Sequence, residues 1–143
     1  MNLRKSLCLI ALGSGFALSG PAPSISQQQT TSTQPELTKI ALKSGESLEI
    51  GTVYFVSQCK SIMTAAPEIE MLEGPPELSL TIKAGDVVPR NQGCTRKVSG
   101  GTIIVTAKEI KETKIVRLMY RIKYKTKDGD RQRANAYMVG LLP

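Results

Sequence analysis

Few residues in this chain have side chains suited to catalysis, and histidine is absent from all 143 positions. Without histidine there is no Ser-His-Asp or Cys-His catalytic arrangement and no histidine metal site. The phosphate-binding patterns GxxxxGK[ST] and GxGxxG are also missing from the sequence. The residues left to consider are carboxylates, cysteines and a surplus of basic side chains, so we predict no catalytic residue, no metal and no cofactor.

Two carboxylates, Glu68 and Glu70, are spaced to lie on one face of a strand, whereas Glu73 falls off that face by parity. Such a pair could serve a small hydrolase if it faced a cleft at a suitable separation. A solvated strand face is the other interpretation. The Asp128-Gly129-Asp130 segment supplies too few oxygens for calcium and is typical of a turn.

The cysteines indicate a single disulfide. Cys8 lies in the apolar N-terminal segment, which leaves Cys59 and Cys94, 35 positions apart. A bridge that closes a loop of this length would stabilise the fold by about 3–4 kcal/mol in the chain-entropy model. Two free buried thiols are the alternative. Because disulfides persist in oxidising compartments, the pair also suggests export.

The N-terminus has the pattern of a secretory signal. Arg4 and Lys5 precede an apolar run from Leu7 to Leu18, and small residues follow it. The run is too short to span the roughly 30 Å of a bilayer core as a helix, although a retained anchor is the alternative. We predict a signal peptide over residues 1–26 with cleavage between 19 and 26, no transmembrane span after its removal, and a periplasmic or secreted protein.

Residues 27–35 are polar and low in complexity, which predicts a disordered tail, and the folded domain is expected over residues 36–143. Apolar side chains alternate in short runs between turn residues, and no helical period is sustained. We predict an all-β fold, an immunoglobulin-like antiparallel β-sandwich of about seven short strands. Tryptophan is absent, so the disulfide should tie loops or strand ends rather than the two sheets. The expected strands are 36–42, 47–57 with a bulge at Gly51, 68–72, 77–83, 102–107 bounded by Gly100-Gly101, and a closing hairpin, with turns at 43–46 and 84–86.

The closing hairpin has two plausible registers around Asp128-Gly129. A two-residue turn there would set Tyr124 against Arg133 and mix charge into the apolar face. A three-residue loop, residues 127–129, pairs Thr126 with Asp130 and leaves one face consistently apolar, with Gly129 where a positive φ is needed. Since a one-residue slip moves every side chain to the other face, patterning favours the three-residue loop.

In the favoured register one face of the hairpin is strongly basic. The whole chain carries a formal charge of +7, and the stretch from Lys114 to Arg133 alone holds eight basic and two acidic residues. We predict an anion-binding ribbon on this face, with a solvated face that resists edge-to-edge aggregation as the alternative. Its members are Arg117, Arg121, Lys123, Lys125, Arg131 and Arg133.

Four segments carry a resemblance to known proteins: 59–61, 71–80, 93–94 and 120–131. Together they resemble a group of small uncharacterised exported proteins of Gram-negative bacteria. The resemblance covers most of the chain from about Gly51 onward. It implies secretion and an immunoglobulin-like sandwich, and it implies nothing about chemistry.

These observations favour an exported, non-catalytic binding or interaction module whose basic C-terminal hairpin contacts anionic envelope or glycan partners. The predicted partners are an anionic glycan, a lipid headgroup or an envelope protein, and nucleic acid is not expected for an exported chain. The alternatives are a small carboxylate-dependent hydrolase and an inhibitor of a secreted enzyme.

The signal peptide gives the first testable prediction. We expect the mature protein to begin between residues 20 and 27, because small residues cluster there after the apolar run. Intact-mass spectrometry of the protein from an envelope fraction measures the start directly. A chain that begins at Met1 would show that the segment is retained.

Overall fold

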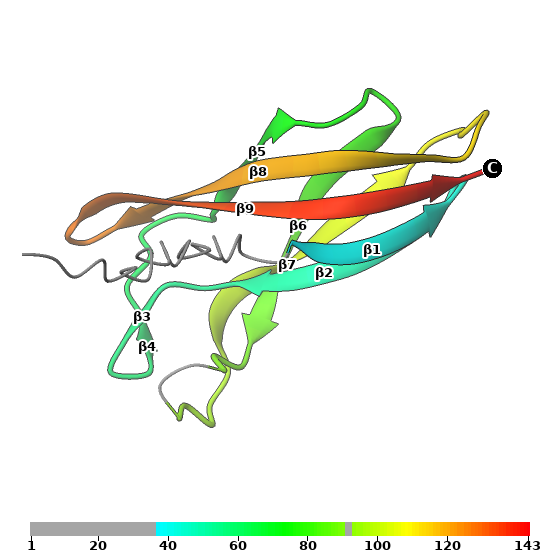
Figure 1. Ribbon diagram of the computed structural model, residues 1–143. Coiled ribbons are helices and arrows are strands. Elements are labelled where there is room, and N and C mark those ends of the chain that lie inside the picture. The colour runs from blue at the N-terminus through cyan, green and yellow to red at the C-terminus, as the bar shows by residue number, and fades with distance from the viewer. Residues whose placement is uncertain (1–36, 91–92) are drawn as a thin grey trace, which may run out of the picture. The chain divides into compact units, whose positions relative to one another are not determined.

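The computed structural model describes residues 37–90 and 93–143. The predicted signal peptide, 1–26, and the predicted tail, 27–35, lie outside the described residues. The described residues form strands and connections without helix, so the all-β prediction is confirmed (Figure 1). No helix among them is long and apolar enough to cross a membrane.

The strands form two main sheets and a small hairpin. The four-stranded sheet has the order β1 (Thr38–Lys43), β9 (Gly129–Leu142), β8 (Lys114–Thr126), β5 (Glu68–Glu73). The three-stranded sheet has the order β2 (Ser47–Val53), β7 (Val98–Ala107), β6 (Leu78–Val87). The small hairpin pairs β3 (Val56–Ser57) with β4 (Lys60–Ser61). Neighbouring strands run antiparallel, as predicted, with the exception of β1 and β9, which are parallel.

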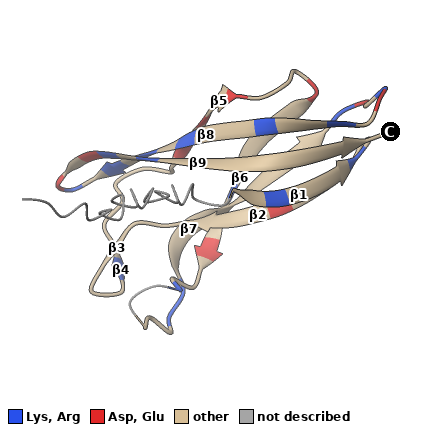
Figure 2. Ribbon diagram, in the orientation of Figure 1, with Lys and Arg blue, Asp and Glu red and all other residues tan. Residues whose placement is uncertain are grey.

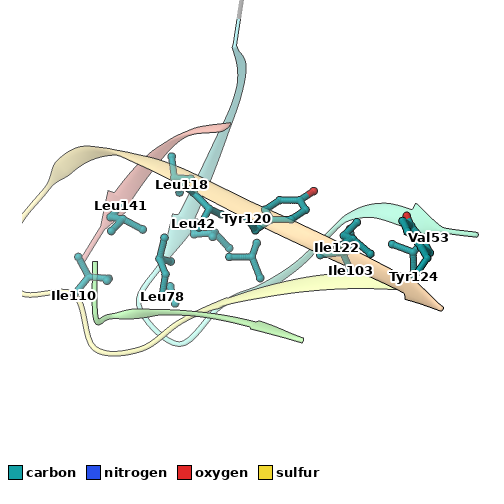
Figure 3. Packing of buried hydrophobic residues seen from close by; sticks show 13 residues of the cluster. Leu42, Val53, Leu78, Ile103, Ile110, Leu118, Tyr120, Ile122, Tyr124 and Leu141 are labelled. Atoms are coloured by element: carbon teal, nitrogen blue, oxygen red, sulfur yellow. The ribbon is translucent and has the colours of Figure 1, made fainter. Parts of the chain in front are cut away.

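One hydrophobic core lies between the two sheets, which makes the fold β-sandwich-like. β8 contributes the largest share, because its alternate residues Leu118, Tyr120, Ile122 and Tyr124 are all buried (Figure 3). The facing sheet contributes buried residues from each of its three strands, and β1 and β9 complete the layer on the β8 side. These residues are Val53, Leu78, Ile103, Val105 and Ala107 from the first group, and Leu42, Val139 and Leu141 from the second.

The register of the closing hairpin differs from the prediction by one residue. Thr126 pairs with Gly129, which has a φ of +103°, and Tyr124 lies opposite Arg131 rather than Gln132. The observed register buries Val139 and Leu141 completely, whereas the predicted one would have turned both outward. Burial at the C-terminal end of β9 therefore decides the pairing, and the prediction was wrong because it weighed only the residues near the turn.

The predicted turn at 84–86 and the predicted strand boundary at Gly100-Gly101 are instead interiors of long strands. β6 runs through 84–86, and β7 runs through Gly100 and Gly101. Gly85 of β6 pairs with Gly100 of β7. A Cβ on Gly100 would collide with the Val53 carbonyl oxygen and lie 2.8 Å from Val87 Cγ2. Gly100 and Gly101 therefore permit the close approach of neighbouring strands within the sheets and do not end β7.

The predicted disulfide is confirmed. Cys59 and Cys94 are bonded with their Cα atoms 5.5 Å apart, a usual separation. Cys59 lies in the tight turn of the small hairpin, where Gln58 and Cys59 both have positive φ (49° and 59°), and Cys94 lies in the connection between β6 and β7. The bridge thus ties two loops together, as the absence of an inter-sheet cysteine core predicted.

The glycine contacts give the second prediction. Gly100→Ala should lower the free energy of unfolding by about 1–3 kcal/mol, because the methyl group overpacks a site bounded by backbone. Gly85→Ala is the matched control: it is the ladder partner of Gly100, yet a Cβ there meets nothing within 4 Å. Urea unfolding measures both variants, and equal stabilities would refute the close-packing role of Gly100.

Candidate functional site

The outer face of the four-stranded sheet is a ladder of paired charges. Glu70 Oε2 lies 2.9 Å from Lys123 Nζ and 3.1 Å from Arg121, and its neighbour Glu73 lies 3.8 Å from Arg117. Figure 2 shows the acidic positions of β5 and the basic positions of β8 along the ribbon. These side chains are roughly half exposed, so each pair adds little stability. Their main effect is to neutralise the basic side chains of β8.

Glu73 joins this face because of a bulge that the sequence analysis did not predict. The register between β5 and β8 shifts at Leu72, so that Met71 lies opposite Tyr120 and Glu73 opposite Met119. The prediction that Glu73 falls off the face of Glu68 and Glu70 is therefore wrong, because a bulge restores the parity.

The six basic residues predicted for one ribbon lie on two faces. Four remain on the outer face, and the observed register places Arg131 and Arg133 on the inner one, opposite Tyr124 and Ile122. On β5, β8 and β9 this face also holds four carboxylates, so the formal charges of these three strands cancel there, whereas β1 adds Lys39 and Lys43. The eight charged residues of the three strands on this face are Arg117, Arg121, Lys123 and Lys125 with Glu68, Glu70, Glu73 and Asp130.

The proposed hydrolase pair gains no support from this geometry. The hydrogen bond from Lys123, together with the charges of Arg121 and Lys123, lowers the pKa of Glu70, which keeps the carboxylate ionised and unsuited to donating a proton. Glu68 borders only a small hollow of about 80 Å³. Among the described residues, no cluster of three or more cysteine, aspartate or glutamate side chains is placed to hold a metal.

A more distinctive site lies between the sheets at the hairpin end. Two hollows, of about 250 and 160 Å³, share Thr52, Tyr124 and Arg133 in their walls. We call them together the inter-sheet cleft. The first is also lined by Tyr54, Phe55, Val56 and Gln132, and the second by Gly51, Ile103, Tyr120, Ile122, Asn135 and Tyr137.

Aromatic side chains hold the walls of the cleft in place. The rings of Phe55 and Tyr124 lie 5.3 Å apart and tilted, and those of Tyr120 and Tyr137 are stacked with centroids 6.0 Å apart. The Tyr137 hydroxyl donates a hydrogen bond of 3.0 Å to the Ile50 carbonyl, which ties β9 to β2 across the sheets. The cleft is therefore largely formed before any ligand binds.

Arg133 is the cationic group of the inter-sheet cleft. Its side chain is exposed, and no carboxylate of the described residues forms an ion pair with it. Burial raises the pKa of Tyr120 and of Tyr124, and the charge of Arg133 acts in the opposite direction on both. A guanidinium beside aromatic faces can take a carboxylate or phosphate in bidentate fashion, with an apolar or ring-bearing part of the ligand against the tyrosines.

The inter-sheet cleft was not predicted from the sequence, although the residue pattern of β9 indicates it. Its inner face is apolar at Tyr137, Val139 and Leu141 and polar at Arg131, Arg133 and Asn135. A strand face that changes from apolar to polar marks the point at which the opposite layer stops covering it. Tyr54 and Phe55, which directly follow β2, gave no comparable signal.

Comparisons with protein-family models, with curated proteins and with solved structures found no match for this chain. The site is therefore interpreted from its own geometry.

The charge ladder gives the third prediction. The lowered pKa of Glu70 means that its contribution to stability is present above the ordinary glutamate value of about 4.3 and is lost as the pH falls through its lower folded value. Glu70→Gln should unfold at lower urea concentration than wild type at pH 7, and the difference should vanish on acidification. Glu68→Gln is the control, since Glu68 forms no ion pair within the described residues. A difference that persists unchanged at low pH would contradict the role of the Glu70 charge.

Proposed function

We propose that this chain is an exported, non-catalytic binding module that holds an anionic partner in the inter-sheet cleft. The observation that carries the proposal is Arg133, a cation without a carboxylate partner among the described residues, in the wall of a preformed aromatic cleft. Small-molecule and peptide sites commonly combine such apolar walls with one or two oriented polar groups.

The disulfide supports export, and the arrangement of the strands supports an immunoglobulin-like sandwich. The Cys59–Cys94 bridge is typical of oxidising compartments, in agreement with the signal peptide expected over residues 1–26. Seven strands of six or more residues in two sheets around one core, within the described residues, are compatible with an immunoglobulin-like sandwich. The periplasm or the extracellular space is thus the proposed location.

Anion binding was predicted from the sequence for the basic residues of the hairpin, and we propose the inter-sheet cleft as the anion site instead. On the outer face, a ligand would have to displace the carboxylates of Glu70 and Glu73 from their basic partners. At Arg133 no such competition arises within the described chain. Anionic glycans, lipid headgroups and envelope proteins all carry groups that a guanidinium recognises.

Replacement of Arg133 tests the function and is the fourth prediction. Arg133→Gln should weaken binding of carboxylate-bearing probes, an oligogalacturonate and an acidic peptide, at least tenfold in calorimetric titrations, because a charge-assisted hydrogen bond is lost. Binding should also weaken as salt rises. Arg121→Gln, on the neutralised outer face, is the matched control and should stay within twofold of wild type. Equal affinities for wild type and Arg133→Gln with every probe would refute the proposed function.

A further inference from the structure

β9 extends far beyond the strand that pairs with its outer edge. It has 14 residues, and β1 pairs with only six of them, Tyr137–Leu142. The other eight, Gly129–Ala136, are hydrogen-bonded to β8 alone among the strands of the described chain. We call these eight residues the free edge of β9. Figure 1 shows β9 running on past β1 toward the hairpin.

The backbone groups of the free edge alternate in direction, and one half of them faces away from β8. The Leu142 carbonyl accepts a hydrogen bond of 2.9 Å from the Ser44 amide, so even-numbered residues of β9 direct their N–H and C=O groups toward the β1 side. By this alternation the backbone groups of Gln132 and Ala134 lie along the edge without a backbone partner among the described residues, and at Asp130 the carbonyl accepts a hydrogen bond of 3.1 Å from Arg131 Nη1. Such a row is a template for an added strand.

The opposite edge of the same hairpin is covered. β5 pairs with β8, and beyond it the segment 62–64 continues the cover: the Thr64 amide donates to the Lys125 carbonyl (2.8 Å) and the Lys127 amide to the Ile62 carbonyl (3.1 Å). The fold therefore covers the β8 edge of the hairpin from Met119 to Lys127, whereas no strand of the described chain covers the β9 edge along Gly129–Ala136.

The free edge adjoins the inter-sheet cleft. Arg133, Asn135 and Tyr137 belong to β9 and line the cleft, while Gly51 and Thr52 of β2 line its other side. A strand added to the edge would continue the sheet in line with β1, whose alternate residues Ile40 and Leu42 point into the core. Its own alternate side chains would therefore point into the cleft.

The inner face of this edge is basic. Arg131 and Arg133 are two residues apart, which places them about 7 Å apart on that face. Inward charges of this kind discourage pairing with apolar strands. They also favour a strand whose inward side chains are acidic, so the same residues that reject most strands select one kind.

We propose that the free edge of β9 accepts an extended segment of another protein as an added strand, with carboxylate side chains at alternate positions facing Arg133 and Arg131. This inference rests on the proposed function, since it assigns the occupant of the same cleft. It selects a polypeptide over a glycan because the edge offers backbone donors and acceptors at the two-residue repeat of a strand.

The rival occupants are the chain's own residues before β1 and a second copy. The segment 27–36 immediately precedes β1, would enter the same edge in continuation of its register, and brings the carboxylate of Glu36. The experiment must therefore establish whether the edge is open in the free protein.

Binding of a synthetic ten-residue peptide of alternating threonine and glutamate to the full mature chain tests the inference and is the fifth prediction. Ala134→Pro should weaken binding at least tenfold, because proline removes an edge N–H while leaving the β8 side of the ladder intact. The wild-type protein should bind a peptide with alternate amides N-methylated at least tenfold more weakly, and a threonine–lysine peptide more weakly still. The N-methylated peptide keeps the test valid if Ala134→Pro fails to fold.

The outcomes separate the two proposals. Suppose that Arg133→Gln weakens peptide binding, while Ala134→Pro binds the peptide as tightly as wild type and the N-methylated peptide binds as tightly as the unmodified one. The strand inference is then wrong and the proposed function stands. If Arg133→Gln binds the peptide and the acidic oligosaccharide normally, both are wrong.

Hydrogen exchange of the free protein, followed by NMR, decides between occupants. We expect fast exchange of the Gln132 and Ala134 amides without peptide and slow exchange with it. Slow exchange in the free protein would overturn the assignment to a partner. Sedimentation would then distinguish a second copy from residues 27–36, since only a second copy doubles the mass.

Discussion

The inner face of β8 is the constraint on which the rest of this structure depends. Leu118, Tyr120, Ile122 and Tyr124 are each no more than 5% exposed, and together they contact both sheets along the length of the core. Burial of side chains of this size stabilises a domain by about 1.5–3 kcal/mol each relative to exposure. Because side chains alternate along a strand, this burial places the basic residues between them on the outer face. The carboxylates of β5 then offset a row of like charges that would otherwise repel.

The same strand passes from a closed core into an open cleft without changing its pattern. Around Leu118 the partner layers are complete, with Leu42, Val139 and Leu141 on the same sheet. Around Tyr124 they are not, because β1 begins only at Thr38, opposite Tyr137, and no other described strand covers this side. Tyrosine suits this transition, since its ring packs against Phe55 while its hydroxyl can remain near solvent. The inter-sheet cleft is thus the end of the core, where the described residues leave one side without cover.

Sequence patterning was sufficient for β8 and insufficient for its neighbours. The strict alternation of β8 predicted its faces, and the cysteine pair predicted the bridge between loops. The register of β9 failed because patterning was judged over residues that turn out to lie outside the core, whereas Val139 and Leu141 decide it. Gly100 and Gly101 were taken for the boundary of a strand because a sequence does not distinguish a glycine that ends a strand from one that admits a neighbouring strand. The bulge at Leu72 depends on pairing with β8 and leaves no local mark.

A long strand with an uncovered edge is a hazard for an isolated protein, and the sequence of β9 limits that hazard without removing it. The residues of β9 before Tyr137 are polar or small, and those from Tyr137 onward are apolar or glycine, so the strand changes character opposite the first residue of β1. If the residues before Tyr137 served only solubility, lysine or proline at the outward positions would suffice. Instead the outward positions include Ala134 and Ala136, whose small side chains leave the backbone accessible, and the two arginines lie on the inner face, with Arg133 beside the aromatic walls. Accessible backbone combined with inward arginines restricts which strands can pair rather than preventing pairing, and this is the physical basis for assigning a selective binding role to this end of the molecule.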